Sequence, residues 1–133
     1  MLKKGAGAIV NISSIAGLVG LPYRNAYTAS KHGVAGITKT LASEWGQHGI
    51  RVNAVSPGYV LTPMVQKLID AGKLDPKVLQ RRTPLGRLAA PEEIGNAMMF
   101  LASPLASYIN GAIIPIDGGY TAYGAAAPAV EIE

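Results

Sequence analysis

The sequence predicts an α/β fold in which three parallel strands form a sheet with helices beside it. Three short β-branched runs are separated by longer segments whose apolar residues recur at helical spacing. The segment between the first two runs is long enough to cross over and return in parallel, and such crossovers are nearly always right-handed. The 133 residues, 49% of them apolar, suffice for one domain with a packed core.

The predicted strands differ in their surroundings. The first is Ala8 to Ile12, whose unbroken β-branched character predicts burial on both faces, as in a parallel sheet. The second is Arg51 to Val55. The third runs from Gly111 to Ile116, and its Pro115 cannot donate a ladder hydrogen bond, so we expect this strand at an edge of the sheet.

The longest predicted helix runs from Asn25 to about Gln47, because its apolar residues fall near helical spacing and glycines follow it. A second begins at Ala90, where a proline and two acids occupy the first turn, and ends before Ser103. Residues 63–71 and 76–82 carry weaker patterns and predict short helices or a lid.

The remaining segments set the domain bounds. Residues 122–133 are rich in alanine and show no period, which predicts a flexible, frayed or extended tail. Residues 1–121 are then a single domain without internal repeats.

Composition excludes several classes of protein. The chain has no cysteine and two histidines, so we expect no disulfide framework and no metal site. The net charge of +4 comes from scattered basic residues, which argues against nucleic-acid binding. The apolar run from Ala8 to Ile12 is too short for a membrane span or a secretory signal, so we expect a soluble, cytoplasmic protein.

Three side chains could form a hydride-transfer site. Ser14 follows the first strand, and Tyr27 and Lys31 are four residues apart on one face of the long helix. A carbonyl that accepts hydride needs a proton, which a phenol supplies, and a polarising hydrogen bond, which a hydroxyl supplies. A phenol has a pKa of about 10, and a neighbouring ammonium group stabilises its phenolate form.

Each of these features has an ordinary structural interpretation when taken alone. A tyrosine four residues before a lysine also occurs on solvated helix faces, and a serine after a strand often only completes a turn. Pro57-Gly58 could likewise be a simple turn after the second strand. Gly5-Ala6-Gly7 is no dinucleotide fingerprint, because a strand follows it where a helix is required.

Further motifs decide between these interpretations by their order and spacing. They are Ile9-Val10-Asn11-Ile12-Ser13-Ser14, Tyr27-Thr28-Ala29-Ser30-Lys31, Arg51-Val52-Asn53-Ala54-Val55-Ser56-Pro57-Gly58, Thr62-Pro63-Met64, Pro84-Leu85-Gly86-Arg87, Pro91-Glu92-Glu93-Ile94 and Asp117-Gly118-Gly119. Jointly they resemble the short-chain dehydrogenase/reductase family from Gly5 to about Tyr120. Only the tail falls outside this resemblance.

The resemblance implies the C-terminal half of a Rossmann-like doubly wound parallel sheet, with the N-terminal nucleotide-binding half absent from these residues. It implies that Ser14, Tyr27 and Lys31 are catalytic. It also implies that NAD or NADP is the cofactor, that Tyr27 and Lys31 contact it, and that the loop residues Pro57, Gly58, Val60 and Thr62 lie along the nicotinamide.

The activity implied is an NAD(P)-dependent oxidoreductase that interconverts a secondary alcohol and a ketone. Glu44-Trp45 and the stretch Pro57 to Met64 look similar to sugar and polyol dehydrogenases, with a 3-oxoacyl thioester reductase as the alternative. A homo-oligomer, tetramer or dimer, is implied as well. We interpret the chain as a truncated piece of such an enzyme, inactive alone; the other possibility is a non-catalytic half that acts only in assembly.

Overall fold

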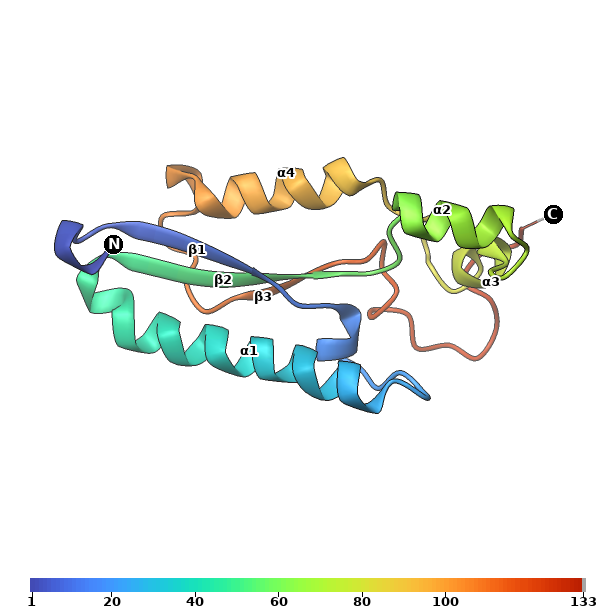
Figure 1. The fold of residues 1–133 in the computed structure, drawn as a ribbon, viewed down its shortest axis with the longest axis horizontal. Coiled ribbons are helices and arrows are strands. Elements are labelled where there is room, and N and C mark those ends of the chain that lie inside the picture. Colours follow the sequence, from blue (N-terminus) through green and yellow to red (C-terminus); the bar gives the residue numbers. More distant parts are fainter. Residues whose placement is uncertain (133) are drawn as a thin grey trace.

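A parallel sheet separates two helical layers in the computed structural model, which describes residues 1–132 (Figure 1). The strands are β1 (Gly7–Ile12), β2 (Ile50–Pro57) and β3 (Ile113–Ile116), in the order β1-β2-β3 with both pairs parallel. The main helices are α1 (Asn25–Trp45), α2 (Pro63–Asp70), α3 (Pro76–Gln80) and α4 (Pro91–Ala102). The predicted strands and helices are therefore confirmed to within about two residues at each end.

The two faces of β2 supply the two cores. Ile50 and Val52 pack with Ala42 of α1 on one face. Val55 packs with Ile94 and Leu101 on the other face, under α4. This alternation follows from the two-residue period of a strand, and it makes β2 the buried centre of the sheet. Figure 1 shows α1 and α4 on opposite sides of the strands, with α2 and α3 beyond their carboxyl ends.

The predicted burial of the first strand on both faces is wrong for this chain. Residues 7–11 of β1 are half-buried, and Ile12 is 52% exposed. The physical reason is position: among the described residues β1 pairs with β2 alone, so one side of it has no neighbouring strand. The apolar run predicts the strand correctly, but full burial belongs to β2, which lies between two neighbours. β3 lies at the opposite edge, as Pro115 predicts.

Amide and guanidinium side chains of β2 tie the elements together. Asn53 of β2 accepts a hydrogen bond from the Ala112 N–H (2.9 Å) and donates one to the Ile109 carbonyl (2.8 Å). Arg51 donates to the carbonyls of Leu101 (2.7 Å), in the last turn of α4, and of Ser103 (3.0 Å), the residue after it. These bonds fix the start of β3 and the end of α4 against the central strand.

The C-terminal tail forms no helix or strand in its described part. The Ala129 N–H donates to the Arg81 carbonyl (2.7 Å), and the Tyr123 hydroxyl donates to the Ala127 carbonyl (2.9 Å). The predicted flexibility of residues 122–133 stays a prediction; Glu133 lies outside the described residues. Between residues 1 and 132 no helix is long and apolar enough to cross a bilayer.

Candidate active site

The two serines after β1 face different neighbours. The Ser13 hydroxyl donates to the Lys31 carbonyl of α1 (3.0 Å). Ser14 caps a single 3-10 turn (Ile15–Gly17), where its oxygen accepts from the Ala16 N–H (3.1 Å). Its own proton has no acceptor among residues 1–132, so it can be donated to a ligand. The sequence does not reveal this turn, because three residues carry no measurable period.

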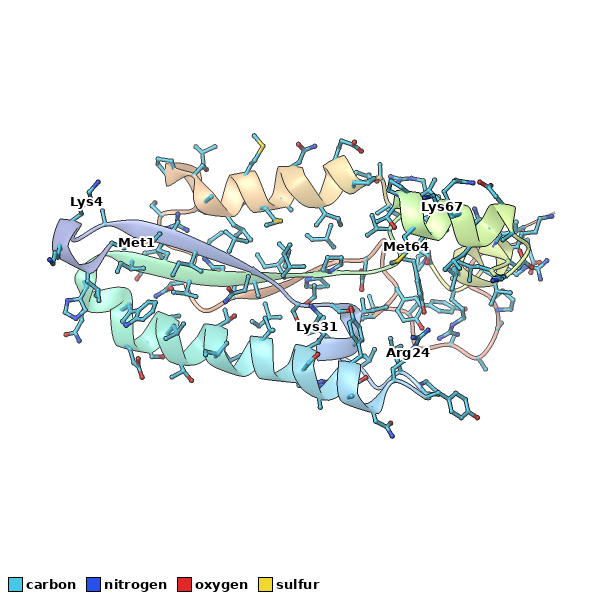
Figure 2. All side chains as sticks on the ribbon, in the orientation of Figure 1. Met1, Lys4, Arg24, Lys31, Met64 and Lys67 are labelled. Atoms are coloured by element: carbon cyan, nitrogen blue, oxygen red, sulfur yellow. The ribbon has the colours of Figure 1, made fainter. Side chains whose placement is uncertain are left out.

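Tyr27 and Lys31 lie together in the first turns of α1. The Lys31 ammonium lies 5.6 Å from the centre of the Tyr27 ring, so the two side chains share one helix face, as their spacing predicts. The ammonium also donates to the Ile12 carbonyl at the end of β1 (3.1 Å). Figure 2 shows Lys31 between α1 and the ends of the strands. A cation and a phenol therefore lie close to the point where the chain leaves β1 and continues through Ser13 and Ser14.

Gly58, the residue after β2, has no room for a side chain. A Cβ at Gly58 would lie 2.9 Å from both the Cα and the Cβ of Asp117, closer than real Cβ atoms approach a backbone. Pro57, the last residue of β2, pairs with Ile116 in the same region. Gly58 therefore lets the ends of β2 and β3 meet. Any contact of Pro57 or Gly58 with a cofactor stays a prediction.

Val60 and Thr62 each keep a donor available. Val60 pairs with Ala89 in an isolated parallel bridge. The hydrogen bonds of this bridge join Ala89 to the Tyr59 carbonyl and the Leu61 N–H, on either side of Val60. The Val60 N–H has no partner of its own among residues 1–132. The Thr62 oxygen caps α2 by accepting from the Val65 N–H (3.2 Å), which leaves its hydroxyl proton free to donate.

A cavity of about 530 Å³ lies in front of these segments. It brings together Ser14, Tyr27 and Gly58 among the site residues predicted from sequence, whereas Lys31, Pro57, Val60 and Thr62 do not line it. Its lining residues are Ser14, Ile15, Leu21, Pro22, Arg24, Tyr27, Gly58, Tyr59, Met64 and Tyr120. The volume falls in the range of small-molecule sites.

Tyr59 and Tyr120 line this cavity but carry no role in the sequence prediction. Their rings meet edge to face, with centroids 5.5 Å apart. Burial, and then the neighbouring Tyr120, raise the pKa of Tyr59 to about 12, so it is a neutral hydrogen-bond donor at ordinary pH. The two residues come from distant segments, and only the meeting of β2 and β3 brings them together.

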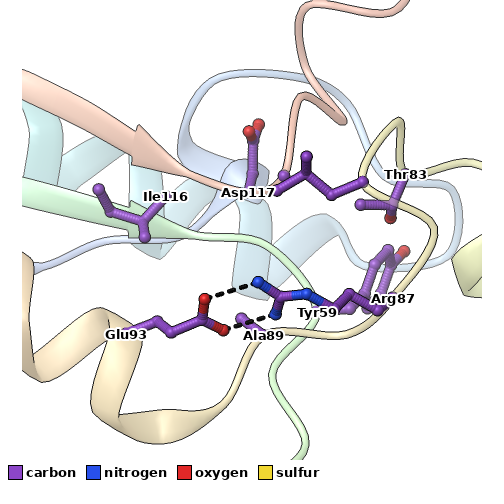
Figure 3. A pocket seen from close by; sticks show the side chains of 9 residues that line it. Tyr59, Thr83, Arg87, Ala89, Glu93, Ile116 and Asp117 are labelled. Carbon is purple, nitrogen blue, oxygen red and sulfur yellow. Dashed lines mark hydrogen bonds and ion pairs between the residues drawn. The ribbon is translucent and has the colours of Figure 1, made fainter.

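A second, smaller pocket also has Tyr59 in its lining (Figure 3). Its volume is about 100 Å³, and Arg87 and Glu93 on its wall form a two-bonded ion pair at 2.7 Å. None of the predicted catalytic residues lines it, and it has room for a few water molecules but not for a sugar. Within residues 1–132, no cluster of three potential metal ligands occurs.

Comparison with known proteins places this arrangement in a family. Residues 1–121 match the family model described as enoyl-(acyl carrier protein) reductase. The chain belongs to the short-chain dehydrogenase/reductase family. The family resemblance of the motifs is thus confirmed, and so is the fold class, because solved members of the family share the three-stranded parallel half-sheet with its flanking helices.

Two curated relatives and one solved structure show the extent of the match. D-threitol dehydrogenase of Mycolicibacterium smegmatis is 51% identical over 121 residues, which cover 91% of this chain and 46% of the relative. The 3-oxoacyl-[acyl-carrier-protein] reductase FabG of Thermotoga maritima is 47% identical over 119 residues, 90% of this chain and 47% of that protein. The solved structure of ElxO with NADP bound is 41% identical, with a TM-score of 0.89 over 92% of this chain and 50% of that one.

The chain therefore spans about half the length of these family members. The family uses NAD or NADP, and ElxO is one neighbour with NADP bound. The matched half contains Ser14, Tyr27 and Lys31, together with the loop from Pro57 to Thr62.

Proposed function

We propose that this chain supplies the catalytic residues of an NAD(P)-dependent oxidoreductase that interconverts a secondary alcohol and a ketone. The observation that carries the proposal is the cavity that the Ser14 and Tyr27 side chains share, with the Lys31 ammonium 5.6 Å from the Tyr27 ring. A donor, an acid-base group and a cation then converge on one place, which is what proton transfer coupled to hydride transfer requires.

Each residue has a defined task in this chemistry. When bound, the nicotinamide cofactor accepts hydride from the alcohol carbon or gives it to the carbonyl carbon. Tyr27 donates the proton to the carbonyl oxygen during reduction and removes it from the alcohol during oxidation. Ser14 donates a hydrogen bond to that same oxygen, and Lys31 stabilises the phenolate that Tyr27 becomes. Oxidation of the alcohol thus yields a ketone, the reduced cofactor and one proton.

The free donors of the chain fit the polar edge of such a cofactor. The unpartnered Val60 N–H and the free Thr62 hydroxyl proton could bond a carboxamide, and Lys31 could bond ribose hydroxyls. Gly58 contributes a wall without a side chain. These contacts would hold the nicotinamide end, and no glycine-rich turn for the phosphates occurs in residues 1–133.

We infer a polyhydroxylated substrate of the sugar or polyol class. The phenols of Tyr59 and Tyr120 provide hydrogen-bonding groups in the cavity, and the D-threitol dehydrogenase relative supports this class. A 3-oxoacyl thioester reductase is the second candidate, favoured by the similarity to FabG. An acyl thioester needs an apolar channel, for which Leu21, Pro22 and Met64 provide one wall.

Replacement of Tyr27 by phenylalanine tests the proposal. We expect the change to lower kcat/KM at least about a hundredfold, in line with the typical contribution of a general acid. Stability should stay nearly constant, because the ring is 47% exposed. Tyr108→Phe is the matched control, since Tyr108 is fully exposed and lies outside the cavity. The assay uses a protein in which these residues are joined to a nucleotide-binding half, and it follows NADH or NADPH absorbance with a panel of polyols. Equal rates for the two variants, in a protein that is active without substitution, would contradict the proposal.

A further inference from the structure

Among the described residues that line the cavity of about 530 Å³, Arg24 is the one with a charged side chain. The other lining residues are apolar or carry hydroxyl groups. Arg24 lies at the start of α1, three residues before Tyr27. Figure 2 shows it at the same end of the sheet as Met64, which lines the cavity from α2. The Lys31 ammonium near Tyr27 and the Arg82 guanidinium 5.9 Å from the Tyr120 ring lie beside the cavity without lining it, so Arg24 is the one cation in its lining.

Arg24 has no counter-ion in the part of the chain that the structure describes. The one ion pair found within residues 1–132 joins Arg87 to Glu93, and the Arg24 guanidinium donates no hydrogen bond there. Tyr59 lies close enough for the Arg24 charge to act on it, but its pKa of about 12 keeps it neutral at ordinary pH. Arg24 is exposed at the edge of the cavity, and solvent alone compensates its charge within the described residues.

The start of α1 adds to this positive field. The first turn of the helix contains no acidic residue, and no side chain caps its free N–H groups. The positive end of the helix dipole and the guanidinium are thus found together at one side of the cavity. A ligand that brings a negative charge would gain from both, and a planar guanidinium binds a carboxylate through two parallel hydrogen bonds.

On the function proposed above, we infer that the substrate carries a carboxylate besides the reacting alcohol, and that Arg24 selects it. A polyhydroxylated acid fits: its hydroxyl groups match the phenols of Tyr59 and Tyr120, and its carboxylate matches Arg24. A carboxylate is favoured over a phosphate because a phosphate dianion carries about twice the charge of a carboxylate, and one guanidinium lines the cavity. The carboxylate takes no part in the redox step and serves to bind and orient the substrate.

Matched substrate pairs test the inference in a purified protein that contains these residues together with a nucleotide-binding half. D-gluconate and D-glucitol, or threonate and threitol, share a polyol chain and differ in one terminal carboxylate. We expect kcat/KM to be at least tenfold higher for the acid of a productive pair. Arg24→Gln should lower that value about tenfold to a hundredfold, mainly through KM, because a hydrogen bond to a charged group is lost. The value for the neutral polyol should change less than about threefold, and Arg24→Lys should restore part of the loss.

Arg81→Gln is the control, because Arg81 bonds the Ile132 carbonyl and does not line the cavity. Equal use of both members of each pair, or an equal loss for both in Arg24→Gln, would overturn the inference while leaving the oxidoreductase proposal intact. A preference for glucitol 6-phosphate over gluconate would overturn the choice of carboxylate.

Absence of turnover in a protein that also contains a nucleotide-binding half would count against the proposed function. For residues 1–133 alone, where we expect no turnover, binding decides the inference separately. Saturation-transfer NMR with gluconate and glucitol supports it if gluconate alone binds and Arg24→Gln abolishes the signal. Equal signals for both ligands, or for both proteins, would overturn it.

Discussion

At the residue scale, the ion pair between Arg87 and Glu93 does more than join two exposed charges. The Glu93 carboxylate receives two hydrogen bonds from Arg87 and one from the Ala90 N–H at the start of α4 (2.8 Å). The bonds to Arg87, and then that to Ala90, lower the pKa of Glu93 to about 2. The pair thus fixes the beginning of α4 and one wall of the smaller pocket, which Tyr59 also lines.

This lowered pKa predicts a pH dependence of stability. The carboxylate has an ordinary pKa of 4.5 in the unfolded chain, so its stabilising effect is fully present above that value and is lost as pH falls towards 2. We expect the melting temperature of the natural protein to exceed that of Glu93→Gln near pH 6, and the two to converge towards pH 2. The difference should be small and weaken with salt, because the pair is exposed.

Thermal unfolding followed by circular dichroism between pH 6 and 2 measures the difference. Glu92→Gln is the control, since Glu92 occupies the same helical turn but forms no ion pair among the described residues. A constant gap between the natural protein and Glu93→Gln over the whole pH range would contradict the assignment.

At the scale of elements, the contact between the carboxyl ends of β2 and β3 shapes the cavity. Gly58 at the end of β2 touches Asp117 after β3, whose carboxylate accepts bonds from the Gly119 and Thr121 N–H groups (2.9 Å each). Those bonds hold the turn that carries Tyr120 into the cavity. A change at Gly58 therefore acts on both strands at once.

Gly58→Ala should push the two strand ends apart. We expect a loss of about 1–3 kcal/mol in the free energy of unfolding, the usual cost of overpacking, together with a loss of activity as Ser14 and Tyr27 part from Tyr59. Gly36→Ala is the control, because a Cβ there meets no atom within 4 Å and alanine favours the α1 helix. Urea denaturation of the two variants makes the comparison, and equal midpoints would refute this view of Gly58.

Contacts of this kind, between segments far apart in the chain, are what the sequence does not predict. The long helix, the strands and the shared face of Tyr27 and Lys31 follow from periodicity and spacing, which are local. Ser13 bonds α1 whereas Ser14 does not, and this difference depends on how the loop after β1 lies against α1. The contact between the rings of Tyr59 and Tyr120 depends on β2 meeting β3. Such contacts join distant segments, so no local pattern encodes them.

At the scale of the molecule, the sheet presents two different edges. β3 is a natural edge, with Pro115 exposed and unable to donate. β1 is β-branched and half-buried, and among the described residues it has a neighbour on one side only. The full burial predicted for β1 is the one strand-level error, and it arises because burial depends on what lies next to a strand and not on its composition alone.

The affinity of residues 1–133 for a dinucleotide follows from the hydrogen-bond donors that they contain. On the proposed function, a protein consisting of residues 1–133 alone offers a dinucleotide the donors of Lys31, Val60 and Thr62, and we expect all three at its nicotinamide end. Helix N-termini after glycine-rich turns bind the pyrophosphate in dinucleotide folds, and these residues contain no such turn. We therefore expect NAD and NADP to bind more weakly than micromolar, and within about tenfold of nicotinamide mononucleotide, by isothermal titration. Micromolar affinity for either dinucleotide would show that the phosphates find partners within these 133 residues, and the basic side chains Arg24, Arg81 and Arg82 would be the first to replace.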